Sequence, residues 1–344
     1  MLLLYVIAAA VFVAGAVELG ARALELAPLE IRYPNNIPDP VLPFRPKPGF
    51  RHIYRSPEFV HEERHNSMGY RDVEHRRNKP AGTFRILALG DSLTWGAGAA
   101  FEETFLVRLE QMLNARTGRH PPVEIIKAGI YAFFPEPERL LLEHEGLAFQ
   151  PDLVMVVFFP NDVQETALGL EAITVTQQGY LMTAEARDLG RVGLWLYMHS
   201  EAARVVLRGV VSRALLRRLP GPAEDIYSPD GSYEAAWRAA EGELKKMIDL
   251  AAAHQARMVL VYIPEKNLDQ PGADYPPQRL AQLCTDGGDK GAEFINLLPA
   301  LRRARAANPD QPLYWPLDGH CTPAGYRVIA ETLFEELTRR GLVP

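Results

Sequence analysis

The sequence predicts an α/β protein, a three-layer sandwich with a central parallel sheet of about five strands, a helical insertion and an N-terminal membrane helix. The first observation is that short apolar runs alternate with helical patterns after residue 83, which is typical of a parallel sheet covered on both faces. The second is that this alternation stops between about residues 163 and 232. The third is that residues 1–17 are uncharged and almost entirely apolar.

These observations divide the chain into three expected regions. Residues 1–28 are predicted to form a membrane anchor helix, residues 29–82 a proline-rich stem and lead-in, and residues 83–344 the α/β domain with a cap-like insertion at 163–232. No internal repeat is visible. We expect the insertion to lie over the ligand site as a cap or lid.

The apolar N-terminal segment would reach about 26 Å as a helix, close to the thickness of a bilayer core. We favour an uncleaved anchor because residues 18–26 continue the helical pattern and the basic start of an ordinary signal peptide is missing. A cleaved signal peptide, with Ala14-Gly15-Ala16 as the small-residue site, and a buried helix remain as alternatives. Arg22 is the only nearby cation, so orientation is poorly determined by charge.

The stem has six prolines in residues 34–48, a composition that favours extended chain over helix. His61-Glu62-Glu63-Arg64-His65 then matches the His-Glu-x-x-His pattern of zinc proteases. That motif requires a helix, whereas Pro57 precedes it here and Asn66-Ser67-Met68-Gly69 follows it as a turn. We interpret the match as chance.

The elements of the α/β domain are predicted from apolar runs and helical stripes. The continuous run at 153–159 is typical of a strand buried on both faces. Strands are expected at 85–89, 123–127, 153–159, 257–263 and 293–297, and helices at 101–117, 136–148, 194–219, 233–254 and 322–340.

The helix expected at 194–219 carries several arginines among valine, leucine and alanine. One interpretation is a solvated helix face, and the other is a surface resting on anionic lipid. The arginines are Arg204, Arg208, Arg213, Arg217 and Arg218.

Composition excludes some classes of function. The chain has 344 residues, 47% of them hydrophobic, and a net charge of −6. There is no basic tract with interleaved aromatics of the kind that binds nucleic acid, so no nucleic-acid partner is expected. Cys284 and Cys321 are too few for a disulfide framework or a zinc site. We expect isolated thiols, with pairing in an oxidising compartment as the alternative.

The stretch that the domain is built around is Gly90-Asp91-Ser92-Leu93-Thr94, where a buried strand stops at a tight turn. Ligands bind at the carboxyl ends of such strands, where a serine can act as a nucleophile. The alternative is an ordinary turn in which Ser92 or Thr94 caps the next helix.

Serine needs a base, a group that orients the base and donors for the oxyanion. His320 is the candidate base and Asp318 the candidate orienting group, in a loop whose following helix has Thr322 as its expected N-cap. The alternative for this loop is a turn with surface polar groups. Besides the N–H of Ser92, we expect oxyanion donors from Gly129, which lacks a Cβ, and from the Asn161 amide. A turn glycine and an Asx-turn are the alternatives.

Four of these segments, in this order, resemble the signature blocks of the SGNH (GDSL-type) hydrolases. Gly90-Asp91-Ser92 resembles the first block, Gly129 the second, Asn161-Asp162 the third, and the Asp318 to His320 segment the last. Residues 66–72 resemble the lead-in of membrane-anchored bacterial members. The resemblance implies an SGNH/flavodoxin-like fold and a serine nucleophile.

The chain departs from the family pattern at two places. Its third block lacks the usual glycine before Asn161. Its last block reads Asp-x-His instead of Asp-x-x-His, a spacing that resembles alginate O-acetyltransferase-like proteins. Residues 263–266 are similar to a Pro-x-Lys segment of the same proteins.

The function expected is a membrane-anchored, periplasmic serine esterase with no metal or organic cofactor. Ser92, His320 and Asp318 would be its triad, and Ser92, Gly129 and Asn161 its oxyanion hole. The substrate would be an ester-bearing small molecule, lipid or polysaccharide. An O-acyltransferase or deacetylase of an envelope polysaccharide, and a non-catalytic scaffold that binds a glycan or partner protein, are the alternatives.

Overall fold

The computed structural model describes residues 1–24, 26, 33–116, 121–183, 189–286 and 291–344. By its internal contacts the chain divides into two compact units. One consists of Met1–Arg45 with Glu171–Leu219, and the other of Pro46–Leu170 with Pro220–Pro344. Each unit is described by itself.

The larger unit is built on a five-stranded sheet with the order β11-β10-β7-β5-β6, in which every pair is parallel. The predicted parallel sheet of about five strands is confirmed. The central strand is completely buried, as its continuous apolar run predicts. The strands are β5 (Phe84–Gly90), β6 (Val123–Gly129), β7 (Leu153–Phe158), β10 (Arg257–Tyr262) and β11 (Glu293–Asn296).

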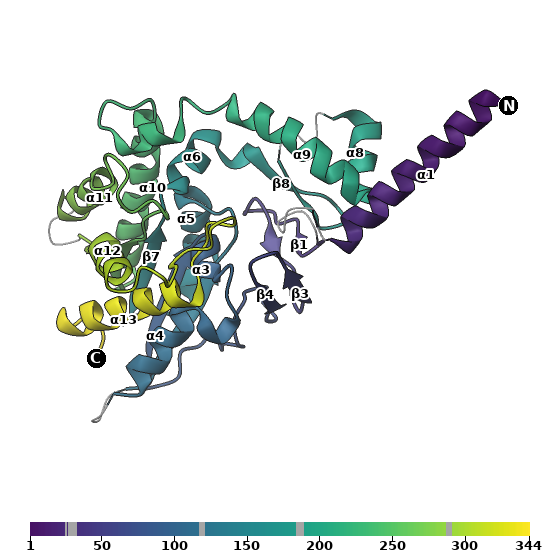
Figure 1. Cartoon of the computed structure of the whole chain (residues 1–344). Helices are drawn as coiled ribbons and strands as arrows, with labels where there is room; N and C mark the ends of the chain where they lie inside the picture. The colour runs from purple at the N-terminus through teal and green to yellow at the C-terminus, as the bar shows by residue number, and fades with distance from the viewer. Residues whose placement is uncertain (25, 27–32, 117–120, 184–188, 287–290) are drawn as a thin grey trace. The chain divides into compact units, whose positions relative to one another are not determined.

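Helices cover both faces of this sheet and complete the three predicted layers (Figure 1). The right-handed crossover rule places α4 on one face and α5, α10 and α11 on the other, because the chain moves in opposite directions along the sheet. Helix α13 packs with α4 and with α12, and α6 packs with α5 and α10. Their bounds are α4 (Phe105–Asn114), α5 (Pro135–His144), α6 (Asn161–Leu168), α10 (Glu234–Ala253), α11 (Tyr275–Asp286), α12 (Leu298–Ala307) and α13 (Pro323–Arg339).

The helix predicted at 101–117 begins later than expected. A 3-10 turn, η1 (Phe101–Glu103), precedes α4, and the predicted end at 117 lies outside the described residues. The predicted helix 136–148 likewise consists of α5 followed by the 3-10 turn η2 (Gly146–Phe149). Two further 3-10 turns are η3 (Leu170–Ala172) and η4 (Ala223–Tyr227).

The lead-in contains a β-hairpin that the sequence did not predict. Strand β3 (Arg51–Arg55) pairs antiparallel with β4 (Val60–Arg64). The hairpin lies in the larger unit and bears on the site described below. Two short strands precede it, β1 (Asn36–Ile37) and β2 (Arg45–Pro46).

The smaller unit holds the apolar N-terminal helix α1 (Leu2–Ala23), drawn in purple in Figure 1. By length and composition α1 is the one candidate membrane span among the described residues. A hairpin of β8 (Ile173–Val175) and β9 (Leu181–Thr183) completes the unit together with two helices. The single helix predicted at 194–219 is wrong, because α8 (Gly190–His199) and α9 (Glu201–Leu216) are separated at Ser200, which has an extended backbone.

Candidate active site

The serine turn is shaped by Gly90 and Asp91 at the end of β5. Gly90 has φ +152°, and a Cβ there would lie 2.1 Å from the Thr94 hydroxyl oxygen, so a side chain would not fit. The carboxylate of Asp91 accepts a hydrogen bond from the Leu93 N–H at 2.9 Å and caps the short helix α3 (Ser92–Trp95). The alternative prediction that Ser92 or Thr94 is the cap is therefore wrong, and capping does not occupy the Ser92 hydroxyl.

Two hydrogen bonds connect Ser92, His320 and Asp318. His320 Nε2 lies 2.7 Å from Ser92 Oγ, and His320 Nδ1 lies 2.6 Å from Asp318 Oδ1. The side chains of His320 and Asp318 are 22% and 23% exposed, so the pair is open to an incoming molecule. Burial alone would raise the pKa of Asp318, but the hydrogen bond and charge of His320 outweigh burial and lower it. Asp318 is therefore held ionised beside the imidazole.

Both ends of the His320 loop are fixed by hydrogen bonds. The Trp315 N–H donates to the His320 carbonyl at 2.8 Å, and the indole of Trp315 donates to the Gly98 carbonyl at 2.9 Å. On the other side, Thr322 accepts from the Gly325 N–H and caps α13, with Pro323 in its first turn. The predicted N-cap is confirmed.

Glu58 was missed by sequence reasoning and contacts the same loop. It lies at the tip of the β3–β4 hairpin, and its carboxylate accepts from the N–H groups of Leu317 and Asp318 at 2.9 and 2.7 Å. The neighbouring Phe59 packs against Trp315 with ring centroids 5.8 Å apart. No sequence signal marks Glu58, because its partners are about 260 residues away and are backbone groups.

The two other predicted oxyanion residues follow the strands on either side of β5. Gly129 ends β6, and a Cβ there would lie 2.7 Å from the Thr94 carbonyl carbon, so β6 approaches α3 closely only with glycine. Asn161 opens α6 just after β7, and its amide nitrogen lies 3.3 Å from Glu165 Oε1. The three turns therefore lie at one edge of the sheet.

Behind the serine turn lies a group of carboxyl side chains that sequence reasoning also missed. Asp91, Glu138 and Asp162 are 1% exposed, and neither oxygen of Glu138 has a hydrogen-bond partner among the residues that the structure describes. Burial, and then repulsion from neighbouring carboxyls including that of Asp91, raises the pKa of Glu138 and of Asp162 well above the usual range. Glu165 has a raised pKa for the same two reasons. These buried carboxyl side chains therefore hold their protons to higher pH than exposed ones do.

The His-Glu-x-x-His match falls on β4 and the residue after it, and not on the helix that a zinc-protease motif requires. The His61 ring is stacked between Tyr54 and Phe59, with centroids 5.5 Å from each. His65 Nδ1 donates to the Lys47 carbonyl at 2.9 Å, and His65 Nε2 lies 2.9 Å from Glu63 Oε1. Among the described residues no group of His, Cys, Asp or Glu is arranged to hold a metal ion. Cys284 and Cys321 are buried and free.

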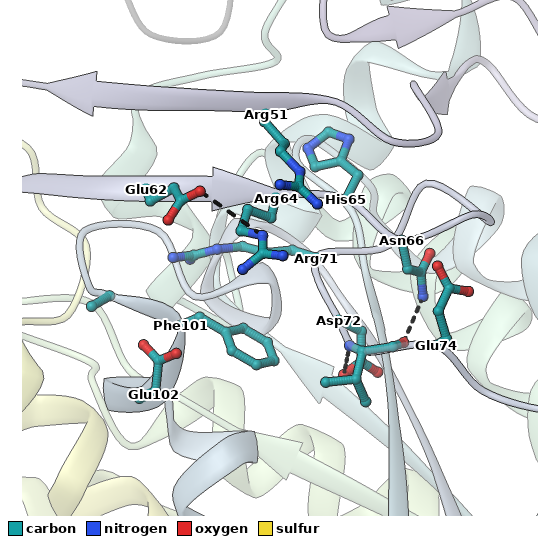
Figure 2. Close-up of a pocket in the computed structure, with 12 residues that line it drawn as sticks. Arg51, Glu62, Arg64, His65, Asn66, Arg71, Asp72, Glu74, Phe101 and Glu102 are labelled. Carbon is teal, nitrogen blue, oxygen red and sulfur yellow. Dashed lines mark hydrogen bonds and ion pairs between the residues drawn. The ribbon is translucent and has the colours of Figure 1, made fainter.

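A polar pocket of about 530 Å³ lies beside the hairpin (Figure 2). Arg51 and Arg64 occupy opposed positions of β3 and β4 in its wall, and Glu62 lies 3.9 Å from the Arg64 guanidinium. Phe101 and Glu102 line it from η1. None of the predicted site residues lines this pocket, which is therefore separate from the Ser92–His320 pair.

The sequence matches the model of the GDSL-like lipase/acylhydrolase family over residues 88–328. The matched segment begins in β5 and ends in α13, so it includes Ser92, Gly129, Asn161, Asp318 and His320. The resemblance of the Asp-x-His spacing to alginate O-acetyltransferase-like proteins is not confirmed by these comparisons. No curated protein matches the chain.

The chain is also similar to solved structures of low sequence identity, among them two bacterial proteins. An acetylxylan esterase from Geobacillus stearothermophilus is 14% identical with a TM-score of 0.46, and the match covers 74% of this chain and 94% of that one. A member of the lipolytic G-D-S-L family from Veillonella parvula is 14% identical with a TM-score of 0.43, and the match covers 74% of this chain and 99% of that one.

Proposed function

The chain belongs to the GDSL-like lipase/acylhydrolase family, and we propose that it is a serine esterase that acts outside the cytoplasm through Ser92, His320 and Asp318. The observation that carries the proposal is the 2.7 Å separation of Ser92 Oγ and His320 Nε2, with Asp318 on the other ring nitrogen. A hydroxyl, a base and an orienting carboxylate in this order are what acyl transfer requires.

In the first half of the reaction, His320 Nε2 takes the proton of the Ser92 hydroxyl as Oγ attacks the ester carbonyl. Asp318 accepts a hydrogen bond from Nδ1–H without taking the proton and stabilises the imidazolium that forms. The tetrahedral intermediate collapses when the C–O bond to the alcohol breaks and His320 returns its proton to the leaving oxygen. The acyl group is then an ester of Ser92.

In the second half, water gives a proton to His320 and its oxygen attacks the acyl carbonyl. The proton passes back to Ser92 Oγ as the acid leaves, which regenerates the free serine. Ser92 N–H, Gly129 N–H and the Asn161 amide are the proposed donors to the negative oxygen of both intermediates. Their three turns share one edge of the sheet, which supports this assignment.

We assign α1 as an uncleaved membrane anchor, which would hold the enzyme at the outer surface of the cytoplasmic membrane. Its 22 residues are long enough to span a bilayer core, and residues 2–17 are uncharged and exposed. Exposed apolar side chains over this length are stable in lipid and costly in water.

The test is turnover of short-chain p-nitrophenyl esters by the full chain in detergent. Replacing Ser92 or His320 by alanine should lower kcat by about 10³-fold or more while the far-UV circular dichroism spectrum stays unchanged. Wild-type activity that persists in Ser92→Ala would exclude Ser92 as the nucleophile.

A further inference from the structure

We propose that α8 and the start of α9 form a second membrane contact, which lies on the surface of an anionic bilayer beside the anchor helix. The inference rests on the proposed anchor and goes beyond the esterase activity. The contact surface consists of the exposed side chains Val192, Trp195 and Leu196 of α8 and Val205, Val206 and Arg213 of α9.

The first argument is the hydrogen bonding between α1 and the α8–α9 junction, all within the smaller unit. The Glu18 carboxylate accepts from the Ser200 hydroxyl at 2.7 Å and from the N–H groups of Glu201 and Ala202 at 3.0 Å. Glu18 thus caps the N-terminus of α9 from another helix. Arg22, one turn further, donates to the His199 carbonyl at 2.8 Å. The junction is therefore fixed to α1.

The second argument is depth. Residues 2–17 precede Glu18 and reach about 24 Å at 1.5 Å per residue, so Glu18 would lie near one boundary of a hydrocarbon core of about 30 Å. Whatever is bonded to Glu18 must lie at that boundary as well. The end of α8 and the start of α9 are consequently placed at the level of the lipid headgroups.

The third argument is the surface that the two helices present. Val192, Trp195 and Leu196 are 74%, 59% and 38% exposed and are spaced at i, i+3 and i+4, so they form one stripe of α8. Val206 of α9 is 71% exposed. A groove of about 750 Å³ lined by Leu194, Trp195 and residues of the β8–β9 hairpin continues this apolar surface. Tryptophan beside an apolar stripe is typical of helices at a membrane interface.

The fourth argument is charge. Residues 189–219 contain six arginines and one glutamate, a net charge of +5 in a chain whose net charge is −6. Arg191 and Arg213 are exposed beside the apolar side chains. Each arginine near an anionic surface strengthens binding by about fivefold. Anionic lipid is thus the partner that fits both the apolar stripe and its charge, and the solvated-face interpretation does not account for the stripe.

The experiment uses the full chain in vesicles of phosphatidylcholine and phosphatidylglycerol. A polarity-sensitive fluorophore is attached at Val192→Cys or Val206→Cys, with Val73→Cys of the larger unit as the matched exposed control. The native cysteines are buried and do not compete for the label. Lipids brominated in the acyl chain should quench labels 192 and 206 severalfold more than label 73. Arg191→Gln with Arg213→Gln should weaken this difference in anionic but not in neutral vesicles.

Equal quenching at 192, 206 and 73, in vesicles whose protein resists carbonate extraction, would overturn the second contact while leaving the anchor in place. Complete carbonate extraction would contradict the anchor and this inference with it. Ester turnover measured on the same vesicles reports separately on the proposed enzyme. Its loss in the wild type would count against the esterase without affecting the lipid contact.

Discussion

At the serine turn, the residues around Ser92 have separate tasks. Gly90 supplies a backbone conformation that leaves room for Thr94, and Asp91 caps α3. His320 contacts the hydroxyl of Ser92, and Asp318 contacts the far side of the imidazole. Asp91 accepts the hydrogen bond of the Leu93 N–H, so the N–H of Ser92 is the proposed donor to a substrate oxygen.

Asn161 is the side chain whose proposed role is most readily tested. Its amide nitrogen makes a long bond of 3.3 Å to Glu165, a partner that orients the amide without binding it tightly. We expect Asn161→Ala to lower kcat by about 10²- to 10³-fold with little change in KM, because the donor acts on the transition state. A kcat within twofold of wild type would exclude Asn161 from the oxyanion hole.

The buried carboxyl of Glu138 makes stability depend on pH. The pKa of Glu138 is higher in the folded state than in the unfolded state. Between these two pKa values the folded state keeps a proton that the unfolded state releases, so unfolding becomes easier as pH rises. This contribution to stability is therefore fully present at low pH and is lost as pH rises toward the folded pKa. Glu138→Gln should raise the free energy of unfolding by about 1–3 kcal/mol at pH 8 and by less at pH 5. Urea denaturation at both pH values measures this.

The control for that experiment is Glu136→Gln, on the same helix α5 but only half-buried. It should leave the free energy of unfolding nearly unchanged at both pH values. A Glu138→Gln variant that is destabilised equally at pH 5 and pH 8 would show that the carboxyl is not protonated in the folded state.

At the scale of elements, the β3–β4 hairpin supports the base from a distance. Glu58 binds two consecutive N–H groups of the His320 loop, and Phe59 packs on Trp315. We expect Glu58→Ala to lower kcat by about 10- to 100-fold, because the loop would no longer hold the imidazole in line with Ser92. Glu58→Gln keeps one acceptor oxygen and should lose less. Steady-state kinetics with separate kcat and KM distinguishes these effects.

Glu62→Ala is the matched control, since Glu62 lies on the same hairpin but its ion-pair partner is Arg64 and not the loop. Its kcat should equal that of the wild type. If Glu58→Ala and Glu62→Ala lose activity to the same extent, the hairpin is needed only for folding and Glu58 does not position the base.

The hairpin also shows where sequence reasoning failed. In β4 the buried positions are His61 and Glu63, whereas Val60 is 57% exposed. This reverses the apolar-in, polar-out alternation by which a strand is detected. Glu63 can be buried because it bonds to His65 and to the Trp95 indole. Trp95 is 32 residues from Glu63 in the sequence and reaches it only in the folded chain, so the local pattern could not reveal the strand.

For the whole molecule, the centre of the sheet was predictable because β5, β7 and β10 are short, mainly apolar runs that are almost entirely buried. The positions of Ser92 and His320 at strand and helix ends were predictable for the same reason. Their contact was inferred from the family resemblance, because 228 residues separate them and no local rule relates them. The cluster of buried carboxyl side chains around Asp91 was not predictable, because its members come from three separate elements.

The proposed anchor helix α1 and the proposed location outside the cytoplasm can be tested in cells. Alkaline phosphatase fused after Pro344 should be active in bacterial cells, because that enzyme folds only in an oxidising compartment. The intact mass of the fusion should include residues from Met1 onward if α1 is not removed. An inactive phosphatase would place the domain in the cytoplasm, and a mass that lacks the first 16 residues would favour a cleaved signal peptide.

The most direct test of the central claim is covalent labelling of the full chain by a fluorophosphonate, with the modified residue located by mass spectrometry. The phosphonate should attach to Ser92 in a single equivalent, and its rate should fall by at least about 10²-fold in His320→Ala, because the imidazole activates the hydroxyl. Labelling elsewhere in the chain, or labelling of Ser92 at the same rate without His320, would contradict serine catalysis by this pair.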